Sequence, residues 1–172
     1  MKKNLLTTLI TLLFILSSAC SALGGTSQTK LDPRTASPCE FLTKEEASEI
    51  LGKEVKASQV GPLPQSGSLS FANCVFASTE GNEISSIGIF FYGRTDPAKG
   101  LESFQVAKER ATARNVLVIV ENMGDEAIWG GDQLMIRKGN LVIGVIASTS
   151  LTQVDLEKSK LAASKVLARI QE

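Results

Sequence analysis

The acidic side chains around a single tryptophan are the residues of this chain most suited to bind a metal or ligand or to take part in catalysis. Residues 123–132 read MGDEAIWGGD, and Glu121 lies just before them. Calcium accepts carboxylate oxygens on a glycine-bearing loop, and a pair of acids can cleave a glycosidic bond. The spacing matches no EF-hand, however, and adjacent acids on one turn would not flank a substrate bond. We predict no metal and no catalytic residue here. Trp129, Asp125 and Glu126 remain candidates for contact with a ligand or partner, with core packing as the alternative for Trp129.

The composition argues against several other kinds of catalysis and ligand binding. The 172 residues include no histidine, so the commonest general base and transition-metal ligand are missing. No Gly-x-Ser-x-Gly segment indicates a serine nucleophile, and the glycines do not have the spacing of a phosphate-binding loop. Charges balance at 18 Lys+Arg against 18 Asp+Glu, with no basic strip among the aromatic residues. We therefore predict a protein that is not an enzyme, needs no cofactor and does not bind nucleic acid.

Three helices are expected to position these residues. Thr43 and Glu46 form a capping box for a helix over 44–51, which Gly52 ends. Asp96 and Pro97 begin a second helix that runs to about residue 113, and residues 152–155 begin a third. The predicted inward-facing residues are Leu101, Phe104, Ala107 and Ala111 on the second helix, and Ala163, Val166, Leu167 and Ile170 on the third.

Two Gly-Asn pairs between strand-like runs predict β-hairpins with two-residue turns, at residues 81–82 and 139–140. Residues 116–120 and 141–147 are apolar on both faces, as central strands are. Residues 61–68 are predicted to form a loop. The expected element order is α-β-β-α-β-β-β-α. It indicates an α+β fold with a mainly antiparallel sheet of about five strands packed by three helices. The turns set these expected pairs: Phe76 with Ile87, Cys74 with Ile89, Ala72 with Phe91, Ile136 with Ile143, and Leu134 with Val145.

The first 19 residues have the pattern of a signal peptide. Lys2 and Lys3 precede an apolar run over 5–16, which is shorter than a membrane-spanning helix requires. Small residues then precede Cys20. This opening resembles bacterial lipoprotein precursors, although Leu16 lies four residues before the cysteine and not the usual three. The resemblance implies that Cys20 becomes an acylated N-terminus anchored stably in a membrane by more than one chain, such as palmitate.

Ordinary cleavage after Ala19 or Ala22 is the alternative to acylation. With the lipoprotein reading, the protein is exported and anchored to a bacterial cell membrane, and its domain faces the extracytoplasmic side. Residues 20–37 are small, polar and marked by glycine and proline, as flexible tethers are. Residues 38–172 are then a single domain, long enough to bury one core.

Three cysteines divide most simply into one lipid acceptor and one bonded pair. The hairpin register places Cys74 on the apolar face of the sheet, where the helical layer that begins near Cys39 must pack. We predict a Cys39–Cys74 disulfide formed in an oxidising compartment. Two buried free thiols are the alternative.

The layout of the domain resembles a family of small actinobacterial-type lipoproteins of unknown function. The shared features are Pro38-Cys39, Leu42-Thr43, an alanine-containing helix that ends at Leu51-Gly52, Cys74 on a strand, and Gly124-Asp125-Glu126-Ala127. The resemblance implies the cysteine pair and a surface-tethered domain, and it brings no activity.

Together these observations favour a lipid-anchored, non-catalytic domain that binds a protein or small ligand at the cell envelope. An envelope hydrolase that uses carboxylates alone, for instance Asp125 and Glu126, is one alternative. A purely structural envelope component is the other. A deep pocket lined by Trp129 and the acids would favour a ligand or a reaction, and a flat apolar patch would favour a protein partner.

Overall fold

The computed structural model describes residues 29–55, 57–61, 71–80 and 83–171. The predicted signal peptide, the lipid acceptor Cys20, most of the 61–68 loop and the Gly81-Asn82 turn lie outside the described residues. The elements in chain order are η1 (Pro38–Glu40), α1 (Lys44–Leu51), β1 (Ala57–Gly61), β2 (Phe71–Glu80), β3 (Glu83–Tyr92), α2 (Pro97–Ala113), β4 (Val118–Ile119), β5 (Glu126–Trp129), β6 (Leu134–Lys138), β7 (Leu141–Ser148) and α3 (Leu156–Arg169).

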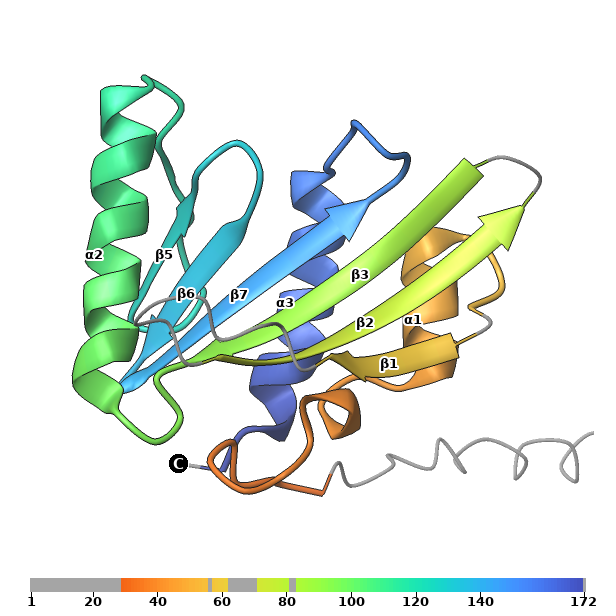
Figure 1. Ribbon diagram of the computed structural model, residues 1–172, viewed down its shortest axis with the longest axis horizontal. Coiled ribbons are helices and arrows are strands. Elements are labelled where there is room, and N and C mark those ends of the chain that lie inside the picture. The colour runs from red at the N-terminus through yellow and green to blue at the C-terminus, as the bar shows by residue number, and fades with distance from the viewer. Residues whose placement is uncertain (1–28, 56, 62–70, 81–82, 172) are drawn as a thin grey trace, which may run out of the picture.

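The strands of the described chain form one twisted antiparallel sheet in the order β1-β2-β3-β7-β6-β5-β4 (Figure 1). The α+β class is therefore confirmed, and the sheet has seven strands where about five were expected. The two strands that the sequence analysis did not predict are β1 and β5. The predicted registers of both hairpins are confirmed, including Cys74 opposite Ile89 and Leu134 opposite Val145. Because side chains alternate between the two faces of a sheet, these registers decide which residues enter the core.

Residues 116–120 do not form a central strand, and that prediction was wrong. Only Val118 and Ile119 pair, as strand β4 at the edge of the sheet, and their side chains are 48% and 57% exposed. The composition of such a run does not distinguish a strand at the edge of a sheet from one in its centre, because β-branched residues are common in both. Strand β7 is central, as predicted: β3 and β6 flank it, and residues 142–145 are buried in succession because helices α2 and α3 contact it.

Helices cover both faces of the sheet (Figure 1). Helices α1 and α3 pack on one face, over a core that includes Phe76, Ile89 and Val145. Helix α2 packs on the other face, where Phe104 contacts Ile128, Met135 and Val142. Among the described residues, no helix is both long enough and apolar enough to cross a membrane.

The helix ends follow the predicted chemistry. Thr43 and Glu46 form the reciprocal capping box of α1, and Gly52 ends that helix in a left-handed conformation with φ 71°. Asp96 and Asp155 cap α2 and α3 through their side chains. Only the apolar stripe of α2 needs correction: Leu101 is 37% exposed, and Gly100 is buried in its place. Gly100 lies one turn before Phe104 and packs against the backbone at Tyr92.

Candidate functional site

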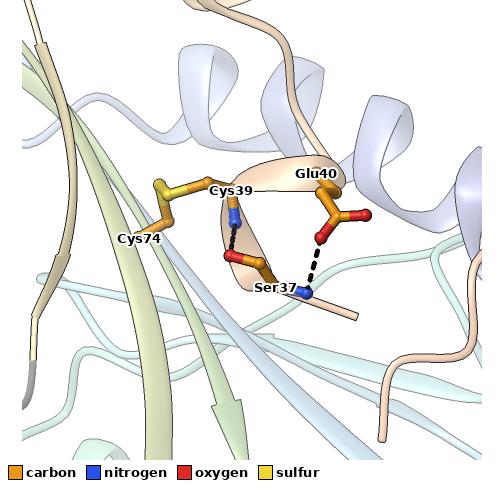
Figure 2. The surroundings of a disulfide bond; sticks show 4 residues. All are labelled: Ser37, Cys39, Glu40 and Cys74. Carbon is orange, nitrogen blue, oxygen red and sulfur yellow. Dashed lines mark hydrogen bonds between the residues drawn. A yellow bond between two sulfur atoms is a disulfide. The ribbon is translucent and has the colours of Figure 1, made fainter. Parts of the chain in front are cut away.

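The predicted disulfide is present and holds the start of the domain against the sheet (Figure 2). Cys39 lies in the short 3-10 helix η1, and its sulfur bonds Cys74 on strand β2, with the two Cα atoms 5.1 Å apart. Ser37 caps η1: its side chain accepts from the Cys39 N–H, and its own N–H donates to Glu40 at 3.0 Å. The local turn therefore points Cys39 at the sheet before any distant contact is considered.

Ordered contacts begin at Leu31, within the stretch that the sequence assigned to the tether. The Leu31 N–H donates to the Arg169 carbonyl at 2.7 Å, and the Gln171 N–H donates to the Leu31 carbonyl at 2.9 Å. Asp32 then accepts from the Arg34 N–H at 2.8 Å and closes a turn. The start of the described chain thus lies beside the end of α3, at the bottom of Figure 1.

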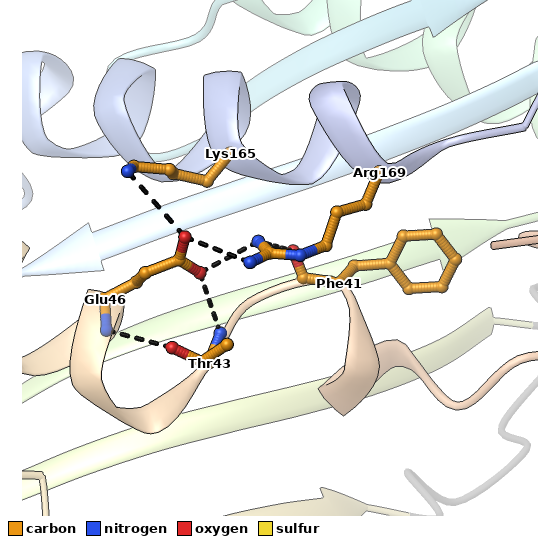
Figure 3. Close-up of polar contacts among 5 residues, drawn as sticks. All are labelled: Phe41, Thr43, Glu46, Lys165 and Arg169. Atoms are coloured by element: carbon orange, nitrogen blue, oxygen red, sulfur yellow. Dashed lines mark hydrogen bonds and ion pairs between the residues drawn. The ribbon is translucent and has the colours of Figure 1, made fainter. Parts of the chain in front are cut away.

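A partly buried carboxylate joins α1 to α3 close to this junction (Figure 3). Both guanidinium nitrogens of Arg169 bind the Glu46 carboxylate, at 2.8 and 3.0 Å, and Arg169 also donates to the Phe41 carbonyl. The Glu46 side chain is only 14% exposed. Burial by itself raises the pKa of Glu46. The hydrogen bonds from Arg169 and Thr43 and the charges of Arg169 and Lys165 outweigh this and hold the pKa below its ordinary value.

The three residues singled out around the tryptophan do not form one site. The segment that was expected to be a turn contains strand β5, in which Glu126 and Trp129 lie at opposite ends. Trp129 is half-buried and packs against the core under α1 and α3. Glu126 extends to the other face, where Lys108 of α2 binds it at 2.6 Å. Trp129 therefore takes part in core packing and is also partly exposed.

Asp125 and Glu126 are both engaged in contacts within the fold. Asp125 accepts from the Gly139 N–H at 2.6 Å and from Arg137 at 3.2 Å, which holds the β6–β7 turn. Arg137 also lies 3.7 Å from Glu126. In the part of the chain that the structure describes, no group of histidines, cysteines and acids could hold a metal ion.

A cavity of about 590 Å³ opens where the two ends of the described chain meet two turns of the sheet. Its walls are the turn at Asp32–Arg34, the β3–α2 turn at 93–97, the β6–β7 turn at 138–141, and residues 170–171. Asp125 completes the lining. The size is in the range of small-molecule sites in proteins. Of the three residues proposed from the sequence, only Asp125 lies here.

Arg94 is the residue of this cavity that combines a hydrogen bond to the backbone with a buried nitrogen that has no partner. Gly93 places it, because φ is 65° there and a Cβ atom would collide with the backbone of Asp96 and Gly100. One nitrogen of the Arg94 guanidinium donates to the Ala36 carbonyl at 2.7 Å. Its Nε is buried and has no hydrogen-bond partner. Sequence analysis missed this residue, since nothing in the order of residues separates it from the other cationic side chains.

A second, shallower groove of about 310 Å³ lies between α2 and the sheet. Tyr92 lies in it and exchanges hydrogen bonds with the Gln133 side chain at 3.0 and 3.3 Å. Burial raises the pKa of the Tyr92 hydroxyl, and the charge of Asp132 acts in the same direction against the Gln133 hydrogen bond. The cationic side chains along this groove, Lys99 and Arg110, are exposed.

Comparisons with models of protein families, with curated proteins and with solved structures find no match to this chain. The geometry of the chain itself is therefore what bears on its function.

Proposed function

We propose that the protein is a lipid-anchored, non-catalytic extracytoplasmic domain that binds a small ligand at the cell envelope. The observation that carries the proposal is the cavity of about 590 Å³, one wall of which is the turn at Asp32–Arg34 within the predicted tether. A site built from four separate segments can enclose a ligand in a way that a flat surface cannot.

The disulfide and the leader support the extracytoplasmic location. Disulfides persist in exported proteins and are rare where cellular thiols are kept reduced. Here the bond closes the loop between Cys39 and Cys74, and Cys74 is fully buried. The leader, with its apolar run and Cys20 after small residues, supports export and acylation by resemblance to lipoprotein precursors.

The contacts of the two acids favour binding over hydrolysis. A carboxylate pair that cleaves a glycosidic bond must flank the bond and leave its oxygens free for substrate and water. Asp125 and Glu126 instead accept hydrogen bonds from Gly139, Arg137 and Lys108. Both are therefore better explained as supports for the β6–β7 turn and for α2.

Substitution of the predicted lipid acceptor tests the proposal. In cells that express the full chain with labelled palmitate, the wild type and a Ser21→Ala control should incorporate label, and Cys20→Ala should not. Cys20→Ala should also leave the membrane fraction while its domain stays folded. Label that remains on Cys20→Ala would contradict the proposed anchor.

A further inference from the structure

The cavity at the junction of the chain ends carries more positive than negative charge. Among its lining residues, the cationic side chains are Arg34, Arg94 and Lys138, and the acidic ones are Asp32 and Asp125. The negative charge of Asp125 is already compensated by Arg137 and the Gly139 N–H, neither of which depends on a ligand. Asp32 accepts a hydrogen bond from its own turn. By formal charge, the lining therefore presents one more cationic than acidic side chain to an anion that entered.

Two guanidinium groups of this lining have donors to spare. Arg34 is exposed, and within the described residues no carboxylate lies within 4 Å of it or of Arg94. Arg94 satisfies the Ala36 carbonyl alone and keeps its buried Nε unpaired. An arginine has five N–H donors, so the guanidinium of Arg94 has N–H groups besides the one that binds Ala36.

We propose that this cavity binds the phosphate group of a small ligand, with Arg94 and Arg34 as its guanidinium donors. The inference rests on the proposed ligand-binding function and names the class of ligand. Guanidinium forks match the oxygens of phosphate and can bind them through two hydrogen bonds at once. The apolar side chains of Pro33, Pro97 and Leu141 line the same cavity and contact the body of the ligand.

The phosphate has two possible sources that share this chemistry. One is a soluble phosphorylated molecule, and the other is the head group of an anionic phospholipid in the membrane that holds the proposed anchor. Arg34 belongs to a turn within the predicted tether, so this part of the cavity lining is close in sequence to Cys20. Two soluble probes separate the sources: inorganic phosphate, and glycerophosphoglycerol, the deacylated form of phosphatidylglycerol.

Isothermal titration calorimetry on the full-length protein in a non-ionic detergent tests the inference at low ionic strength. At least one probe should bind saturably at a single site, and Arg34→Gln should weaken that binding about tenfold, as expected for loss of a charge-assisted hydrogen bond. Arg94→Gln should weaken it by at least as much. Because Arg94 also supports Ala36, its melting temperature is measured in parallel. Arg34 is exposed, so its substitution keeps the test valid if Arg94→Gln unfolds.

Arg110→Gln is the matched control, because it removes the same charge from the shallower groove beside α2. Binding of phosphate alone indicates a soluble ligand, and binding of the diester indicates a head group; both support the inference. Absence of saturable binding by either probe would overturn it, as would equal weakening by Arg110→Gln. This measurement does not depend on acylation, so failure of the anchor and failure of the site give different results.

Discussion

Glu46 connects helix α1 to helix α3 through both of its carboxylate oxygens. Arg169 binds the two oxygens, the Thr43 N–H donates to one of them at 3.0 Å, and Lys165 lies 3.7 Å from the other. The carbonyl of the same Arg169 accepts from the Leu31 N–H near the start of the described chain. A single arginine therefore holds the start of the domain, α1 and α3 together, which makes its partner the most informative residue to change.

Glu46→Gln should lower the free energy of unfolding by about 1.5–3 kcal/mol, the usual range for hydrogen bonds to a charged group. The amide keeps the shape of the side chain but leaves Arg169 without its counter-charge. Glu45→Gln is the matched control, since Glu45 is exposed on the same turn. It should change stability by less than about 1 kcal/mol. Denaturant unfolding at neutral pH measures both. If both variants lost the same unfolding free energy, the loss would come from the charge of an acid near the helix N-terminus and not from the contact with Arg169.

The same pair predicts how stability depends on pH. The folded protein holds the pKa of Glu46 below its ordinary value, which is about 4.3 in an unfolded chain. The contribution of the ionised carboxylate is therefore fully present above that pH and is lost as the pH falls through the folded-state pKa. The stability difference between wild type and Glu46→Gln should shrink below about pH 4. A difference that stays constant down to pH 2.5 would contradict this.

At the scale of elements, the disulfide is the strongest single constraint on the N-terminal segment. It closes a loop with a sequence separation of 35 residues. On the chain-entropy model, removing it should lower the free energy of unfolding by about 4 kcal/mol. Denaturant unfolding of the Cys39→Ala/Cys74→Ala double variant measures this. Cys20→Ala, which removes the third cysteine, should leave stability unchanged. Two thiols that react with an alkylating reagent in the unreduced exported protein would contradict the bond.

Helix α2 is attached to the sheet mainly through one aromatic side chain. Phe104 is 4% exposed and contacts Ile128, Met135 and Val142. Phe104→Ala should lower the free energy of unfolding by about 3 kcal/mol. Leu101→Ala, on the same helix, should lower it by less than about 1 kcal/mol. Thermal or denaturant unfolding of the two variants tests which residues of α2 face the sheet. Equal losses of unfolding free energy would show that Leu101 packs in the core as Phe104 does.

Local signals account for the elements that were predicted well. A Gly-Asn turn fixes the register of a hairpin within a few residues. The face of the sheet on which Cys74 lies could therefore be predicted without knowing where the helices pack. The Thr43–Glu46 capping box is equally local. Strand β4 was misplaced, because whether an apolar strand is central or at an edge depends on its neighbours in the sheet, and these come from other parts of the chain.

At the scale of the whole molecule, the cavity is a product of topology. The start of the domain returns to the end of α3, and both lie beside the turns that follow β3 and β6. Arg34 lies in a stretch with the composition of a tether, and Arg94 lies in a turn with no recognisable motif. Their meeting could not be predicted, because it depends on contacts between segments more than 50 residues apart, such as that of Arg94 with Ala36.

The central claim is an exported domain that is anchored by lipid at Cys20 and closed by one disulfide. Intact-mass spectrometry of the unreduced protein from its native membrane tests both parts in one measurement. The account predicts a chain that begins at Cys20, carries the mass of more than one acyl chain, and is two hydrogens lighter than its fully reduced form. A chain that retains the leader, or begins at Cys20 or Leu23 without added lipid, would contradict it.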